Sequence, residues 1–206
     1  MRLFAAIDLP SGVADSLAER VAEAQRTDAV MRWVPREEWH LTLAFFGSVR
    51  DDRVEELLTR LRRAAARSGP LTLEMGAADV VGSPRRTRVL WCAVSSDSAG
   101  LAALAASSRA AGRRIGLDIP ALAPDVRFRP HVTVARVPRP GDVSATVEAM
   151  NGAGSAPARW TAEQAVLVRS DLGDGPGGRP LHSVVAALPL GRRSGAPDAQ
   201  PRRPTT

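Results

Sequence analysis

The sequence contains two short stretches of the same pattern, HLTLA at residues 40–44 and HVTVA at residues 131–135. Each reads histidine, apolar residue, threonine, apolar residue, alanine. Alternate side chains of a β-strand point to the same face, so the histidine and threonine of each stretch share one face and the apolar residues share the other. Two such strands, 91 residues apart in the chain, predict pseudo-symmetric lobes that bring the histidines face to face across a cleft.

Helix and strand patterns surround these two stretches. Apolar residues at helical spacing predict amphipathic helices at residues 11–26, 52–67, 101–112 and 143–150. Short apolar runs bounded by turn residues predict strands at residues 2–8, 40–46, 71–75, 88–94, 128–137, 160–168 and 181–188. This order of elements indicates a mixed α/β or α+β fold with antiparallel sheets.

The composition is that of an ordinary globular domain, with 44% hydrophobic and 24% charged residues among 206. The single Cys92 excludes an internal disulfide and a cysteine-based zinc site. No apolar run approaches the roughly 20 residues that a membrane-spanning helix needs. We interpret the first residues as a strand rather than a signal peptide. We therefore expect a cytoplasmic protein that does not bind a membrane.

The net charge of +6 is unevenly distributed. Residues 191–206 hold four arginines and one aspartate, which is half of that net charge. This segment has no hydrophobic periodicity, so we expect it to be a disordered tail after a single domain formed by residues 1–190. The modest positive charge that remains on the domain fits a phosphate-bearing partner.

Two imidazoles with two flanking hydroxyls suit the chemistry of phosphoryl groups. The unperturbed pKa of imidazole is near 6.5, so His40 and His131 can supply one acid and one base at physiological pH. The hydroxyls of Thr42 and Thr133 can donate hydrogen bonds to non-bridging phosphoryl oxygens. This chemistry requires no metal, and the sequence has no His-Glu-x-x-His motif. The alternative interpretation is two coincidental strands whose histidines lie in a core.

Longer segments around both stretches resemble the 2H phosphoesterase superfamily. The resemblance is to the bacterial RNA 2′,3′-cyclic phosphodiesterases, also known as 2′-5′ RNA ligases, and it extends over residues 1–190. It is carried by the repeated His-x-Thr-x pattern within these segments: RLFAAIDLP, MRWVPREEWHLTLAFFGSV, RRTRVLWCAV, FRPHVTVARV and LVRSDLGDGPGGRPLHSVVAALPL.

The resemblance implies an α+β bilobal fold, with two mainly antiparallel sheets flanked by helices around a central cleft. It implies hydrolysis of RNA 2′,3′-cyclic phosphates to 2′-phosphomonoesters without a cofactor or metal, and reversible joining of RNA ends by a 2′-5′ bond. In such enzymes the histidine matching His40 is the proton donor and the one matching His131 is the proton acceptor. Thr42 and Thr133 match the positions that hold the phosphate. We also expect a monomer.

This chain departs from its relatives at two positions near the expected site. Many relatives carry lysine where this sequence has Ala44, which by strand parity shares a face with His40. Relatives often carry an aromatic residue where this sequence has His182. We interpret His182 as a structural replacement rather than a third catalytic group.

Several further residues are secondary candidates for substrate contacts. Arg129 lies two residues before His131, so strand parity places it on the same face, where it can bind the phosphate. Phe46 shares parity with His40 and is a candidate for base stacking, although core packing is the favoured interpretation. Core packing is also favoured for Trp33 and Trp39. The arginine-rich residues 85–88 are a candidate for guiding RNA electrostatically.

Two alternatives to this function stay open at this point. The first is a 2H esterase that acts on small cyclic nucleotides, ADP-ribose cyclic phosphate or 2′-5′ oligoadenylate. The second is a non-catalytic protein that binds RNA ends. An RNA enzyme should prefer oligonucleotides over a cyclic mononucleotide, and the first alternative should not. The second alternative should bind RNA ends without turnover.

Overall fold

The computed structural model describes residues 1–27, 31–81, 87–125, 127–153 and 158–191. Within these residues the chain forms four α-helices: α1 (Ser11–Gln25), α2 (Asp51–Ala66), α3 (Gly100–Arg114) and α4 (Ser144–Gly152). The strands are β1 (Arg2–Asp8), β2 (Arg32–Trp33), β3 (His40–Ser48), β4 (Leu71–Val80), β5 (Thr87–Ser96), β6 (His131–Gly141), β7 (Arg159–Ala162), β8 (Gln164–Asp171) and β9 (Leu181–Pro189). The tail predicted for residues 191–206 lies almost wholly outside the described residues.

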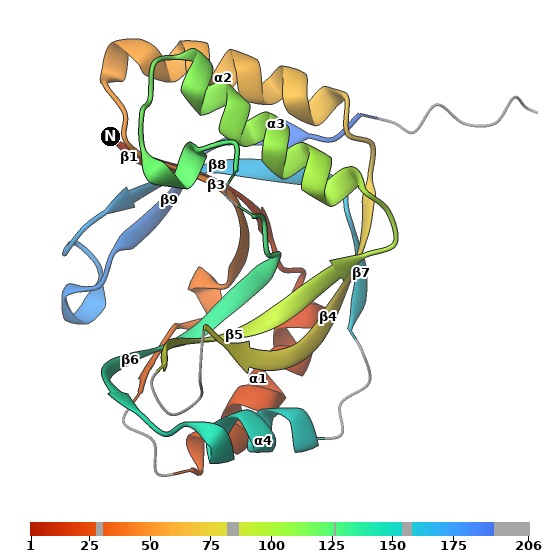
Figure 1. Cartoon of the computed structure of the whole chain (residues 1–206), viewed down its shortest axis with the longest axis vertical. Helices are drawn as coiled ribbons and strands as arrows, with labels where there is room; N and C mark the ends of the chain where they lie inside the picture. Colours follow the sequence, from red (N-terminus) through yellow and green to blue (C-terminus); the bar gives the residue numbers. More distant parts are fainter. Residues whose placement is uncertain (28–30, 82–86, 126, 154–157, 192–206) are drawn as a thin grey trace, which may run out of the picture.

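The strands form one curled antiparallel sheet in the order β7-β4-β5-β6-β3-β1-β8-β9, with β2 added beside β6 (Figure 1). The two motif strands, β3 and β6, are neighbours at its centre. They are joined by a single register pair, Leu41 opposite Val132. The α+β antiparallel architecture predicted from the sequence is confirmed. The two expected sheets are the two halves of this one sheet, which meet at that narrow junction.

Each half of the sheet is covered by helices from both parts of the chain. Helices α2 and α3 pack together over the half that contains β3, β8 and β9, whereas α1 and α4 pack together against the half that contains β4 and β5 (Figure 1). The helix α1 follows β1 in the chain and yet covers the opposite half. The guanidinium of Arg20 on α1 donates to the carbonyls of Gly76 and Met150 in that half, at 2.9 and 3.1 Å. The halves are thus interlocked by exchanged helices.

The main differences from the predicted elements lie at strand ends and breaks. The apolar run at residues 160–168, predicted as one strand, is two strands separated by Glu163. Strand β7 pairs with β4 in one half of the sheet, and β8 pairs with β1 in the other. The chain therefore crosses between halves at Glu163, whose carbonyl accepts a hydrogen bond of 2.8 Å from the amide of Leu190. Strand periodicity alone does not reveal such a crossing. No helix among the described residues is long and apolar enough to cross a membrane.

Close packing of α3 against β3 supports the motif strand from behind. A methyl group on Gly112 of α3 would lie 2.9 Å from Phe46 of β3 and 2.7 Å from Leu122. Both of these side chains are fully buried, so neither can move aside into solvent. The absence of a side chain at position 112 therefore sets how closely the helix approaches the strand.

We predict that Gly112→Ala destabilises the fold by about 1–3 kcal/mol, because an extra methyl group overpacks this contact. The matched control is Gly12→Ala in α1, where an added Cβ meets nothing within 4 Å. That substitution should stabilise the protein by about 0.4–1 kcal/mol through the unfolded chain. Thermal unfolding checks both variants, at roughly 2–4 °C per kcal/mol for a chain of this size. Equal melting temperatures for the two variants would contradict the packing argument.

Candidate active site

The four side chains of the repeated pattern surround the junction between the two halves of the sheet. Leu41 and Val132, which pair across that junction, are fully buried on the helix-covered side. The neighbouring residues on each strand point to the other side because side chains alternate along a strand. Four half-buried side chains therefore share that face: His40, Thr42, His131 and Thr133. The structure brings together all four predicted residues.

Both histidines are held by the same backbone contact. The Nδ1 atom of His40 lies 2.7 Å from the carbonyl oxygen of Glu38, and the Nδ1 atom of His131 lies 2.7 Å from that of Arg129. A carbonyl oxygen can only accept, so Nδ1 carries the proton in both rings. Each imidazole is consequently left with Nε2 as the atom that can take up or release a proton. The two motifs thus repeat a backbone contact as well as a sequence pattern.

Aromatic rings fix the orientation of both imidazoles. Phe4 of β1 stacks on His40 with ring centroids 4.7 Å apart and planes inclined at 26°. Trp91 of β5 meets His131 edge-on at 5.2 Å and 70°. His182 of β9 meets His40 at 5.6 Å and Phe4 at 5.1 Å, both edge-on. Sequence reasoning missed Phe4 and Trp91, because pairing between distant strands places them beside the motifs, and it named His182 only as a structural replacement near the site.

Burial makes His40 a weak base in the ligand-free protein. It lowers the pKa of His40 from 6.5 to about 4, chiefly because the imidazolium loses its hydration there. The hydrogen bond to the Glu38 carbonyl acts in the opposite direction, and positive charge on His182 or His131 lowers the pKa further. The last two effects require all three imidazoles to lie within electrostatic reach of one another. A bound anion would favour the protonated form and raise the pKa again.

A β-bulge corrects two positions predicted from strand parity. In the pairing of β1 with β3, Ala6 faces Thr42 but Ala5 faces Ala44, which leaves Leu43 as an extra residue. The bulge reverses the parity of the strand beyond it. The prediction that Ala44 shares a face with His40 is therefore wrong, because Ala44 is 3% exposed and packs in the main core.

The same bulge exchanges the roles of two phenylalanines. Phe46 is fully buried in the main core, which confirms core packing and excludes a stacking role. Phe45 instead packs with Phe4 in a small apolar cluster outside that core, and the guanidinium of Arg2 lies 4.7 Å from its ring centroid. Phe45 thus lies on the face of His40, where strand parity had placed Phe46.

The remaining predicted candidates have mixed outcomes. Trp33 and Trp39 pack against the main core, and the indole of Trp39 donates to the carbonyl of Val34 at 3.0 Å. The side chain of Arg129 is exposed, and strand β6 begins only at His131, so strand parity does not extend back to it. Of the arginine-rich residues 85–88, the first two lie outside the described residues, and Arg88 is exposed.

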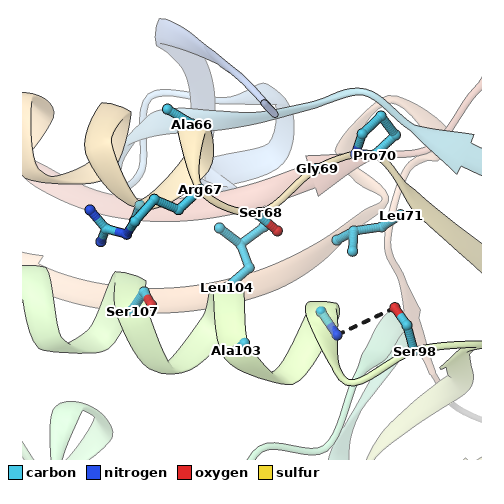
Figure 2. A pocket seen from close by; sticks show the side chains of 12 residues that line it. Ala66, Arg67, Ser68, Gly69, Pro70, Leu71, Ser98, Ala103, Leu104 and Ser107 are labelled. Carbon is cyan, nitrogen blue, oxygen red and sulfur yellow. Dashed lines mark hydrogen bonds between the residues drawn. The ribbon is translucent and has the colours of Figure 1, made fainter. Parts of the chain in front are cut away.

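A cavity of about 610 Å³ lies away from the histidines, between α2, α3 and the start of β4 (Figure 2). Its described lining consists of alanine, serine, glycine, proline and leucine residues with one ionisable side chain, Arg67. It therefore offers no acid–base pair. Among the residues that the structure describes, no group of three or more histidine, cysteine, aspartate or glutamate side chains could hold a metal ion.

Known proteins with a related sequence identify the family of this chain. The sequence pattern of the LigT-like phosphoesterases matches residues 7–91, which include the first motif. An Escherichia coli protein named RNA 2′,3′-cyclic phosphodiesterase is 31% identical over 147 residues, which cover 68% of this chain and 78% of that protein. The chain belongs to the LigT-like phosphoesterase family. A relative of the same name from Thermus thermophilus is 29% identical over 97% of this chain and 96% of its own length.

Other members of the family differ in length or are known as structures. The Geobacillus stearothermophilus relative, also named RNA 2′,3′-cyclic phosphodiesterase, is 27% identical, and the match covers 96% of this chain but 59% of that protein. A crystal structure of a Thermus thermophilus protein superposes with a TM-score of 0.75 at 26% identity, over 93% of this chain and 99% of that one. The apo structure of Escherichia coli LigT gives a TM-score of 0.67 at 25% identity, over 93% and 98%. The fold of this LigT-like phosphoesterase is thus that of its family.

We predict that the imidazole of His40 titrates near pH 4 in the ligand-free LigT-like protein, because burial disfavours its charged form. Adding inorganic phosphate should move this titration to higher pH, since an anion beside the ring stabilises the imidazolium. NMR titration of labelled imidazoles measures both values, and His40→Gln assigns the signal. A His40 titration at or above pH 6.5 without ligand would contradict the assigned burial.

Proposed function

We propose that this protein hydrolyses RNA 2′,3′-cyclic phosphodiester ends to 2′-phosphomonoesters. The observation that carries the proposal is the symmetry of the two imidazoles. Both donate Nδ1–H to a backbone carbonyl 2.7 Å away, and both keep Nε2 for proton transfer on the same side of the Leu41–Val132 junction. Reaction at phosphorus needs one such group for the attacking water and another for the leaving oxygen. The names of the relatives support this substrate class.

The proposed mechanism assigns one step to each imidazole. Nε2 of His131 takes a proton from water, whose oxygen attacks phosphorus. The bond between phosphorus and the 3′ oxygen then breaks, and Nε2–H of His40 protonates that oxygen. The product carries the phosphate on the 2′ oxygen. Attack on phosphorus by a 5′ hydroxyl in place of water, with the same loss of the 3′ oxygen, would join RNA ends by a 2′-5′ bond, and the reverse of this step would cleave that bond.

The threonines and the charged phosphate complete this proposal. No hydrogen bond within the described part of the chain occupies the hydroxyls of Thr42 and Thr133, so both can donate to non-bridging oxygens. His40 must be protonated when substrate is bound, although burial lowers its pKa in the free protein. The negative charge of the bound phosphodiester supplies the missing stabilisation of the imidazolium. The exposed Arg129 beside the second motif is proposed to attract that same phosphate.

This proposal extends to the setting of the reaction. The single free cysteine, Cys92, is buried in the core, as suits a reducing compartment such as the cytoplasm. All four motif residues come from one chain, so a monomer can carry out the reaction. Residues 1–190 are proposed to form the whole catalytic unit.

The decisive experiment incubates the protein with a short RNA that ends in a 2′,3′-cyclic phosphate. We expect a 2′-phosphate product and faster turnover than with a cyclic mononucleotide. His40→Ala and His131→Ala should each lose about 10²–10⁴ in rate, which is the usual contribution of a positioned acid or base. A 3′-phosphate product would overturn the assigned direction of cleavage. Preference for the mononucleotide would favour the small-ligand alternative, and binding without turnover would favour the RNA-end binding protein.

A substrate with a better leaving group separates the roles of the two histidines. We predict that His40→Ala loses much less rate on a nitrophenyl phosphodiester than on RNA, because nitrophenolate leaves without protonation. His131→Ala should stay impaired on both substrates, since water still needs a base. Initial rates at matched pH measure the difference, and product analysis checks the orientation of the ester. Rescue of His131→Ala alone would reverse the two assignments.

A further inference from the structure

The third histidine of the chain lies in the same site as the two motif histidines. His182 is half-buried on β9, opposite Ser170 of β8. Its ring is 5.6 Å from that of His40, and both rings contact Phe4. This packing agrees with the interpretation of His182 as a structural replacement, but a group this close to His40 also faces whatever His40 binds.

The contacts of His182 define which of its nitrogens carries the proton. Its Nδ1 atom is buried and has no hydrogen-bond partner among the described residues. A buried N–H donor without an acceptor is costly, so the favoured form keeps a lone pair on Nδ1 and the proton on Nε2. Nε2 is not among the buried unpartnered atoms. It is the nitrogen of this ring that remains available to a ligand.

His182 also remains neutral in this environment. Burial lowers its pKa, and the carboxylate of Glu38, in the turn before β3, opposes that effect. Its ring also contacts that of His40, whereas on β8 Arg169 and Asp171 flank its register partner Ser170 and therefore point to the opposite face of the sheet. These two charged side chains pair with each other, since Arg169 Nε lies 2.6 Å from Asp171 Oδ2. Protonation of the ring would also add an N–H at the buried Nδ1, which has no acceptor among the described residues.

We propose that His182 is a third substrate-binding imidazole, which donates its Nε2–H to an oxygen of the terminal ribose on the leaving-group side of the RNA. This assignment rests on the proposed function, in which His40 protonates the leaving 3′ oxygen. His40 presents a lone pair or a transferable proton, whereas His182 presents a fixed donor that is neutral at physiological pH. The two neighbouring rings are thereby suited to different oxygens of one nucleotide.

The test compares His182→Phe, which keeps the aromatic packing without a donor, with His182→Gln, which keeps an N–H near the position of Nε2. Loss of one substrate hydrogen bond should raise KM for the cyclic-phosphate RNA about five- to tenfold in His182→Phe, with kcat changed less than about twofold. His182→Gln should restore most of the affinity. The control is Ser183→Ala, the next residue on β9, whose side chain points to the opposite face. An unchanged KM in His182→Phe overturns the proposal, as does a loss in kcat alone.

A second measurement separates this inference from the proposed activity. Binding of 2′-AMP, the expected type of product, is measured by calorimetry without turnover, and His182→Phe should weaken it by about the same factor. NMR of the wild-type protein should show His182 as the neutral Nε2–H form from about pH 7 to 8, because its pKa is lowered from 6.5. An Nδ1–H form, or titration within that range, overturns the assignment even if RNA is hydrolysed. In a further outcome, the wild-type protein fails to hydrolyse RNA while 2′-AMP binding and the NMR form of His182 are both as expected. That outcome refutes the proposed activity and retains the binding role of His182.

Discussion

The site depends on one backbone pairing between β3 and β6, in which Leu41 lies opposite Val132 at the point where the two halves of the sheet meet. Hydrogen bonding between β3 and β6 at this point fixes which residues lie side by side. Because side chains alternate along each strand and paired residues point to the same face, the residue before and the residue after each member of the pair lie together on the other face. Both histidines and both threonines are placed there by main-chain pairing. Their arrangement is therefore built into the sheet rather than assembled from loops, which favours a preorganised site.

Much of this could be predicted from the sequence because it depends on short-range alternation. The histidine and threonine of each motif lie on one face as a strand of period two requires, and the apolar residues between them are buried. The amphipathic stripes of α1, α2 and α3 likewise predicted helices close to their observed bounds. The repetition of the pattern in two corresponding places also predicted that the two histidines lie face to face, and a single copy could not have predicted this.

The features that escaped prediction depend on contacts between distant strands. An extra residue at Leu43 reverses parity, so extrapolation along β3 misplaced Ala44 and Phe46. The apolar run around Glu163 changes its partner strand without any change in periodicity. His182 reaches His40 because β9 and β8 extend the sheet beyond β1, and one strand does not record how far its neighbours reach. Local sequence defines the two faces of a strand but does not define its register.

The exchange of helices between the halves has a consequence for how the molecule folds. Neither half of the sheet can complete its apolar cover from its own stretch of chain, since α1 and α3 each cover strands of the opposite half. An autonomous lobe would leave an uncovered hydrophobic face in water. The two halves must therefore assemble in a single cooperative event, dominated by contacts between residues far apart in sequence, and such topologies fold slowly.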